Sequence, residues 1–299
     1  MKIKKVTEGD YPGFIRLWKL TFGDSEESIR AFLDHFGDEL QAFSLEKDGK
    51  ICSALTRFRM GNLQAPPPAQ SAVPVWVSYA ICTDPDARNQ GFGSALTDFN
   101  RLEVLRQGGC SMLSPASQDL IGFYEPLGYR PAFMVEEQRV PAAENRTDLY
   151  PIRISPEEYG ELREELLKNT VHVRLSRKTL ALEETYCTEG GFFKTAENSM
   201  IFTLEKNTGG NMYLPEILRS RAVSEKELRT TVSAIATVFG QKEILLRTPA
   251  LTGSGSAKVQ AMISGPESRI KGAENLPDPR RPESAPGTDF APYFGFPFD

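Results

Sequence analysis

The sequence predicts an α/β (α+β) fold in which a mixed central sheet is flanked by helices and a second α/β domain follows. Residues 75–82 form an apolar strand pattern, residues 93–106 place apolar side chains at helical spacing, and residues 110–114 are apolar again. A strand, a helix and a strand in this order form a right-handed crossover, so we expect the two strands to be parallel. A chain of 299 residues is long for a single hydrophobic core, which predicts two domains.

Two helices are predicted before this crossover. Apolar residues recur at helical spacing from Phe14 to Phe22, and Gly23 should end this helix. A second helix is expected to follow at once, because Asp24 with Glu27 three residues later matches a capping box.

A hairpin and an extended loop should connect these helices to the crossover. Strand patterns at 41–46 and 51–60 flank Asp48-Gly49, a dipeptide typical of tight hairpins. The prolines of residues 64–74 exclude a regular element there.

A short helix and closing strands should complete the first domain. The helix is expected over residues 117–128, ending at a glycine, and the strands over 129–140. Residues 1–148 thus form a complete predicted α+β unit, and residues 149–299 form the second domain.

The second half repeats the order of the crossover. A strand pattern at 211–218 precedes a capped helix at 224–240 and a strand at 243–248. Before these elements we expect a helix over 155–168 and strands from Thr179 onward. The second domain is thus predicted to be a degenerate repeat of the first. Residues 264–289, rich in Pro, Gly and charge, are predicted to be a mobile insertion before an aromatic C-terminal tail.

Composition excludes several classes of function. The net charge is −5 without a basic stripe, which argues against nucleic-acid binding. Residues 1–150 carry −4 of this charge, which mildly favours a cationic substrate such as an amine, although a solvated acidic surface is the more common reason for such a charge. No apolar run is long enough to span a membrane and no signal sequence is evident, so we expect a cytoplasmic protein. With two histidines and four widely spaced cysteines, neither a metal site nor a disulfide framework is expected.

The crossover carries a candidate anion site. Gly91 and Gly93 let the backbone approach a ligand at the start of a helix, whose free N–H groups and dipole attract phosphate, and Arg88 adds charge. A dinucleotide fingerprint would need glycine where Leu96 stands, and a Walker loop would need Gly-Lys-Ser/Thr. A tight strand-to-helix turn without a ligand is the remaining alternative.

Two segments carry a family resemblance. Ile81-Cys-Thr-Asp-Pro-Asp-Ala-Arg-Asn-Gln-Gly-Phe-Gly-Ser-Ala-Leu96 resembles the acetyl-CoA motif of the GNAT superfamily of N-acetyltransferases, with its Arg/Gln-x-x-Gly-x-Gly core. Phe123-Tyr-Glu-Pro-Leu-Gly-Tyr129 resembles the final helix pattern of that family. The resemblance covers residues 1 to about 140. The start of the chain and its C-terminal extension look closer to the enhanced-intracellular-survival type of GNAT protein.

This resemblance implies a set of acetyl-CoA contacts. The loop and first helical turn would hold the pyrophosphate with the backbone of Arg88, Asn89, Gln90, Gly91, Phe92, Gly93 and Ser94. The backbone of Ile81, Cys82 and Thr83 would pair with pantetheine like an added strand. Ser117 occupies a position where many relatives contact the cofactor through Asn. Acetyl-CoA is expected as a co-substrate, without a metal.

The resemblance also places Tyr124 beside the sulfur of CoA, where its phenol could protonate the leaving thiolate as general acid. The alternative is a tyrosine that packs in the core beside Phe123. An oxyanion donor is expected from a strand N–H near Thr83. Cys82, without a partner base, is expected to be a small core residue rather than a nucleophile.

No acid precedes Asp84 on the strand, so the general base must come from elsewhere. In the resembling family the terminal carboxylate reaches the active site, and this chain ends in Asp299. We expect Asp299 to act there, with a tail packed only on the second domain as the alternative.

Three functions remain open. The first is an N-acetyltransferase that moves the acetyl group to a primary amine, on a small molecule or a peptide, by direct attack. The second is an acyl-CoA-binding sensor or interaction protein in which transfer is vestigial. The third, an aminoacyl transferase, would need a basic tRNA groove that the charge does not supply. The sequence allows a homo-oligomer without predicting one.

Overall fold

The computed structural model describes residues 1–66, 72–144, 149–187, 190–206, 209–250, 256–265 and 293. The chain forms two compact units. Unit 1 comprises Met1–Asn62, Val73–Arg130 and Met262–Ile270, and unit 2 comprises Leu63–Ala72, Pro131–Ala261 and Lys271–Asp299. The α/β fold with a mixed sheet flanked by helices is confirmed, and the domain boundaries at 148 and 149 stay a prediction.

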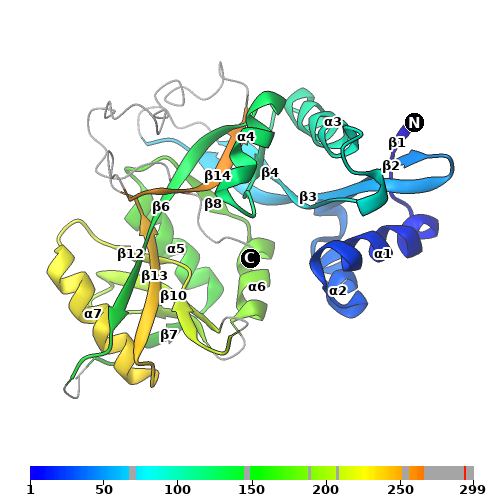
Figure 1. Cartoon of the computed structure of the whole chain (residues 1–299). Helices are drawn as coiled ribbons and strands as arrows, with labels where there is room; N and C mark the ends of the chain where they lie inside the picture. The colour runs from blue at the N-terminus through cyan, green and yellow to red at the C-terminus, as the bar shows by residue number, and fades with distance from the viewer. Residues whose placement is uncertain are drawn as a thin grey trace. The chain divides into compact units, whose positions relative to one another are not determined.

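Unit 1 is built around five strands and four α-helices in the described residues. In chain order these are β1 (Lys2–Lys5), α1 (Tyr11–Phe22), α2 (Glu26–Phe36), β2 (Leu40–Lys47), β3 (Lys50–Gln64), β4 (Val73–Thr83), α3 (Phe92–Arg106), β5 (Cys110–Leu113) and α4 (Ile121–Tyr124). The sheet runs β1-β2-β3-β4-β5, and the end of β14 (Lys258–Ser264) pairs antiparallel with β5. Figure 1 shows α1 and α2 on one face of this sheet and α3 on the other.

The hairpin and the crossover are confirmed. Strands β2 and β3 pair antiparallel around Asp48-Gly49, both of which have positive φ. Strand β5 pairs parallel with β4, as the crossover requires. The helix expected over 117–128 is instead a 3₁₀ turn, α4 and a second 3₁₀ turn at Glu125–Leu127. Pro126 interrupts the regular hydrogen-bond ladder of that segment.

Helix α2 starts differently from the prediction. Its N-cap is Ser25, whose hydroxyl accepts a hydrogen bond from the N–H of Ser28. Asp24 instead accepts a hydrogen bond from the indole Nε1 of Trp18 at 2.7 Å. The expected capping box at Asp24 is therefore wrong, because the buried indole needs an acceptor and takes this carboxylate.

Aromatic rings fill the space between α1, α2 and the sheet. Their centroids lie within 4.4 to 6.3 Å of their neighbours, in mostly edge-to-face contacts. The rings belong to Phe14, Trp18, Phe32, Phe36, Phe58 and Tyr79. This packing fixes the two helices against β3 and β4, because large rings bury much apolar area.

Unit 2 continues with eight complete strands, the start of a ninth and three helices in the described residues. They are β6 (Arg130–Pro141), β7 (Ile152–Ile154), α5 (Pro156–Leu167), β8 (His172–Leu175), α6 (Arg177–Tyr186), β9 (Gly191–Lys194), β10 (Met200–Lys206), β11 (Met212–Leu214), β12 (Ile217–Arg219), α7 (Glu225–Val238), β13 (Glu243–Pro249) and the start of β14. Strands β6 and β13 pair antiparallel over seven residues, from Glu243↔Pro141 to Pro249↔Val135. Figure 1 shows α7 beside these strands.

The predicted helices over 155–168 and 224–240 are confirmed as α5 and α7, each capped by the expected serine. The strands expected from Thr179 are wrong at that position, which lies in α6. Ser176 caps this helix by accepting from the N–H of Thr179. The N-cap formed by Ser176 therefore decides the local structure, although threonine residues such as Thr179 are common in strands.

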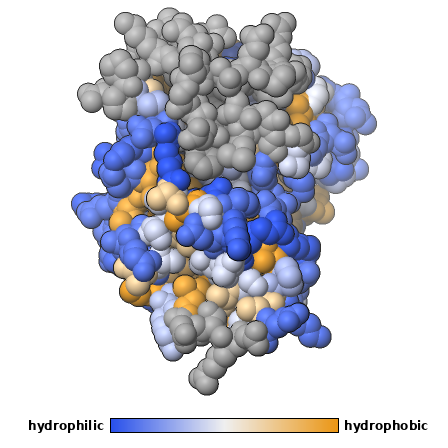
Figure 2. Space-filling model, turned by 90° about the vertical axis from the view of Figure 1, so that its left-hand side faces the viewer, coloured by the Kyte–Doolittle hydropathy of each residue, from blue (hydrophilic) through white to orange (hydrophobic). Residues whose placement is uncertain are grey.

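The face of the molecule that carries α7 is mixed in character. Figure 2 shows small hydrophobic patches between hydrophilic residues on this face. No helix in the described part of the chain is both long and apolar enough to span a membrane. Most of the predicted insertion 264–289 and of the tail, including Asp299, lies outside the described residues.

Candidate functional site

The site begins where β4 and β5 stop pairing. Their parallel register covers Val75↔Cys110, Trp76↔Ser111 and Val77↔Met112. From Ser78 to Thr83, this edge of β4 has no strand partner on the β5 side in the described residues. A strand edge left open in this way offers backbone N–H and C=O groups to an extended ligand.

An irregular backbone marks the middle of this open edge. Ala80 has a φ of 52°, which is unusual for a residue with a Cβ. On either side, the carbonyls of Tyr79 and Cys82 accept hydrogen bonds from the hydroxyls of Thr56 and Ser53, at 2.9 and 2.8 Å. Backbone strain of this kind is common at functional sites. Here the strained residue comes directly before residues 81–83, which are predicted to contact the ligand.

The loop after β4 is exposed, as an anion site requires. Residues 88–91 are exposed, and Asn89 and Gly91 have φ values of 61° and 76°. Gly91 is the N-cap of α3 and supplies no side chain to the N–H groups of the first turn. These N–H groups, together with the helix dipole, remain available to an anion.

Gly93 is needed for close packing. A Cβ at this position would lie 3.0 Å from the Oγ1 atom of Thr83, the last residue of β4. The start of α3 therefore lies directly against the end of the open edge. Phe92 is buried and Ser94 is half-buried. Because Gly93 lies against Thr83, the two segments predicted to contact the ligand, residues 81–83 and 88–94, meet at this junction.

Lys47 is a neighbour that the sequence did not indicate. Its ammonium donates to the Oε1 atom of Gln90 at 3.4 Å and lies 5.7 Å from the centroid of the Phe92 ring. The exposed guanidinium of Arg88 has no hydrogen bond or ion pair within the described residues. Two exposed cations thus flank the loop, one of them from the distant β2–β3 hairpin.

Tyr124 lies near the point where the strands diverge. Its ring is 6.1 Å from that of Tyr129, whose hydroxyl is 2.7 Å from the Oγ atom of Ser111 on β5. Tyr124 is 8% exposed, and its ring meets that of Phe123 edge-to-face at 5.0 Å. Burial, with a smaller effect of Tyr129, raises the pKa of the Tyr124 phenol to about 12. The phenol therefore stays protonated at neutral pH.

A buried polar network holds α3 against β4. Asn100 on α3 donates to the hydroxyl of Ser78, at 2.9 Å, and accepts from Arg57 through its Oδ1 atom, at 3.3 Å. The Arg57 side chain is 1% exposed, and burial lowers its pKa. Its guanidinium also donates to Gln41, so the buried charge is well supplied with acceptors.

Two further sequence expectations concern Cys82 and Ser117. Cys82 is buried, its thiol donates to the carbonyl of Ala54, and burial raises its pKa to about 12, so it is not a thiolate nucleophile. Ser117 is exposed at the N-cap of the first 3₁₀ turn before α4. Its hydroxyl makes no capping bond and can face a ligand.

These features agree with the comparisons to known proteins. Residues 2–132 match the family model described as an acetyltransferase (GNAT) domain. Residues 2–132 therefore form a GNAT acetyltransferase domain, and the resemblance noted from the motifs is confirmed for this part of the chain. This domain supports acyltransferase activity. No curated protein matches the chain.

Solved GNAT structures share the fold of most of the chain. A probable N-acyltransferase from Enterococcus faecalis V583 is 14% identical, with a TM-score of 0.66, covering 88% of this chain and 72% of that one. A GCN5-related N-acetyltransferase from Kribbella flavida is 15% identical, with a TM-score of 0.65 and coverages of 88% and 70%. Eis1 from Mycobacterium abscessus is 13% identical, with a TM-score of 0.57 and coverages of 88% and 73%.

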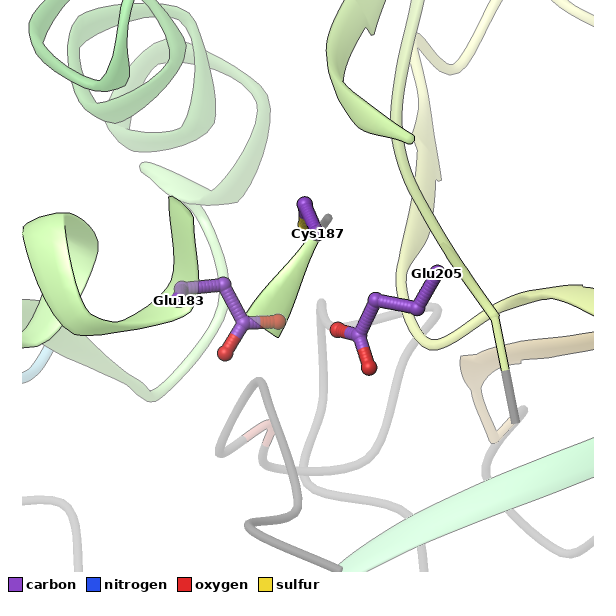
Figure 3. Close-up of side chains that lie close together, drawn as sticks. All are labelled: Glu183, Cys187 and Glu205. Carbon is purple, nitrogen blue, oxygen red and sulfur yellow. The ribbon is translucent and has the colours of Figure 1, made fainter. Parts of the chain in front are cut away.

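Unit 2 brings Glu205 of β10 close to Glu183 and Cys187 at the end of α6, and these three residues are possible metal ligands. Figure 3 shows the carboxylates of Glu183 and Glu205 directed toward each other near Cys187. Their ligating atoms lie within 4.8 Å of one another. Burial and the two carboxylates raise the pKa of the Cys187 thiol, whereas metal binding needs a thiolate. We assign no metal to this cluster.

Proposed function

We propose that this acetyltransferase moves the acetyl group of acetyl-CoA to a primary amine by direct attack, with Tyr124 as general acid. The observation that carries the proposal is the open edge of β4, which leads into the uncapped start of α3 next to Gly93. An extended thioester chain can pair with the open strand edge, and the diphosphate at its end can bind the N–H groups at the start of the helix that follows.

The residues present fit acetyl-CoA as co-substrate. The backbone of residues 81–83 would pair with the pantetheine amides, and the N–H groups of residues 88–94 would hold the pyrophosphate. Arg88 and Lys47 would add charge, and Ser117 would contact the same molecule from the segment before α4. The fit depends on Gly93, because a larger residue would push α3 away from Thr83.

The transfer requires one bond to form and one to break. A neutral amine attacks the thioester carbonyl, and the developing oxyanion is stabilised by a β4 N–H near Thr83. The C–N bond forms, the C–S bond breaks, and the Tyr124 phenol donates its proton to the thiolate. The nitrogen, which is positively charged after the attack, releases one proton to give the amide, and this proton restores the phenol from the phenolate. An amine with a pKa of about 10.4 must first lose a proton, and we assign its acceptance to the carboxylates of Asp299.

The acceptor is an amine on a small molecule or a peptide, consistent with the acidic net charge of −5. We propose no nucleic-acid or membrane partner. The expected location is the cytoplasm. The proposal allows a monomer or a homo-oligomer. Among GNAT proteins, the enhanced-intracellular-survival type is the proposed closest group.

A second candidate is an acyl-CoA-binding sensor in which transfer is vestigial. The burial of Tyr124, at 8% exposure, favours it, because a packed tyrosine can be purely structural.

Release of free thiol from acetyl-CoA over a panel of amines distinguishes the two candidates. For the enzyme, we expect amine-dependent release and a fall in kcat of about 100-fold in Tyr124→Phe, with little change in KM for acetyl-CoA. Phe keeps the ring packing and removes only the hydroxyl, so loss of fold is not the expected cause. Binding of acetyl-CoA without turnover on any amine would support the sensor instead.

A further inference from the structure

The diverging strands of unit 1 have a counterpart within unit 2. Strand β11 pairs parallel with β13 through Tyr213↔Leu245 and Leu214↔Leu246. Pro215 and Glu216 then interrupt the strand, and β12 pairs with β10 instead of β13. The strand, helix and strand order of β11, α7 and β13 thus repeats that of β4, α3 and β5, including the early end of the pairing.

The start of α7 is closed to phosphate, unlike that of α3. Ser224 accepts from the N–H of Glu227 at 3.2 Å, and the Glu227 carboxylate accepts from the N–H of Ser224 at 2.7 Å. This capping box satisfies donors that an anion would need. Its carboxylate, with that of Glu225, also repels a second anion.

A small hollow lies between β12, the end of β13 and the start of α7. Its apolar lining consists of Leu166, Leu167, Ile217, Leu218, Leu228 and Pro249. Its polar lining includes Glu136, Gln138, Arg219, Glu225 and Thr248. The free volume is about 40 Å³. A water molecule needs about 10–15 Å³ on the same measure, so the hollow suits a short alkyl chain and is too small for an aromatic ring.

The hollow carries one uncompensated negative charge. Arg219 forms an ion pair with Glu225 at 3.0 Å and also donates to the carbonyl of Val223. Gln138 accepts from Arg229 at 3.0 Å. The half-buried carboxylate of Glu136 has no hydrogen bond or ion pair within the described residues. A carboxylate beside an apolar floor is complementary to a cation that carries a short hydrocarbon chain.

We propose that this hollow in unit 2 binds a short alkylammonium group, with the chain against Ile217, Leu218 and Leu228 and the ammonium on Glu136. The site consists of unit 2 residues alone, and the proposal does not depend on the proposed transfer reaction. The same group occurs in a free aliphatic amine and at the end of a lysine side chain, so both sources share this chemistry.

Methyl NMR titrations of the full-length protein test the proposal. We expect n-butylammonium to shift the methyl signals of Ile217, Leu218 and Leu228 in a saturable manner, and 1-butanol to bind roughly fivefold more weakly because it lacks the charge. A second titration with Nα-acetyl-lysine N-methylamide identifies the source. Tighter binding of this compound assigns the site to a lysine side chain, and tighter binding of n-butylammonium assigns it to a free amine.

Glu136→Gln is the decisive variant, because it keeps the size of the side chain and removes its charge. It should weaken n-butylammonium binding roughly fivefold and leave 1-butanol binding unchanged. Glu243→Gln is the matched control: Glu243 is exposed at the far end of β13 and pairs with Arg139, so its loss should leave both affinities unchanged. Equal binding of the two ligands by the unaltered protein, or an unchanged affinity in a folded Glu136→Gln variant, would overturn the proposal.

Discussion

At the scale of single residues, the cations beside the α3 loop should govern affinity for acetyl-CoA rather than the chemical step. Arg88 and Lys47 are exposed and lie next to the loop, but neither lies at the point where β4 and β5 diverge. A phosphate contact made equally in the ground state and the transition state changes KM and leaves kcat unaltered.

We therefore expect Arg88→Ala and Lys47→Ala each to raise KM for acetyl-CoA about fivefold, with kcat unchanged. The effect should shrink at high salt, because exposed charges are screened. Steady-state kinetics at two ionic strengths measures it. Acetyl-pantetheine, which lacks the diphosphate, is the control substrate, and an equal loss with this substrate would contradict phosphate binding.

At the scale of elements, the junction of β4 and α3 depends on a missing side chain. A Cβ on Gly93 would lie 3.0 Å from Thr83 Oγ1, which is tighter than most Cβ contacts in proteins, so the helix start or the threonine would have to shift. Gly93→Ala should therefore displace the helix start and reduce kcat/KM for acetyl-CoA about tenfold, because pyrophosphate contacts depend on that position.

A double variant tests this steric explanation. Thr83→Ala removes the atom that the new Cβ would meet, so Thr83→Ala with Gly93→Ala should recover most of the lost kcat/KM. Kinetics of the two single variants and the double variant gives the coupling. Additive losses would show that Gly93 matters for a different reason.

The elements also show how far sequence patterns reach. The extents of α1, α3 and α7 follow from apolar spacing and from signals next to the helix ends, such as Gly23 and Ser224, which act locally. The start of α2 was misplaced because the acceptor that Trp18 needs is not visible in a capping pattern. Lys47 was missed for a similar reason, since only the folded hairpin brings it to Gln90.

At the scale of the whole molecule, the last residues of this sequence supply the proposed proton acceptor, Asp299. Tyr293, near the end of the chain, is fully buried, and its N–H and carbonyl bond to Val171 and Val173. This anchoring shows that part of the aromatic tail packs within unit 2. The contribution of Asp299 stays a prediction, because that residue lies outside the described part of the chain.

Deletion of Asp299 should lower kcat/KM about 100-fold at neutral pH if its carboxylates accept the proton of the amine. Asp299→Asn removes only the side-chain carboxylate, so it tests whether that group accepts the proton. Thermal unfolding checks that the tail remains packed. An unchanged kcat/KM after the deletion would remove the tail from the mechanism.

Buried thiols make unit 1 sensitive to alkaline conditions. Burial raises the pKa values of Cys82 and Cys110 from 9.0 to about 12. Between these pH values the unfolded chain binds fewer protons than the folded chain, so the free energy of unfolding is intact below pH 9 and falls as pH rises toward 12. Each thiol should account for about 1 kcal/mol by pH 10.

Denaturant unfolding followed by the fluorescence of Trp18 and Trp76 measures this loss between pH 8 and pH 10. Because Cys82→Ala removes one titrating group, the stability of this variant should fall about 1 kcal/mol less over the same interval. An identical pH dependence in both proteins would contradict the assignment.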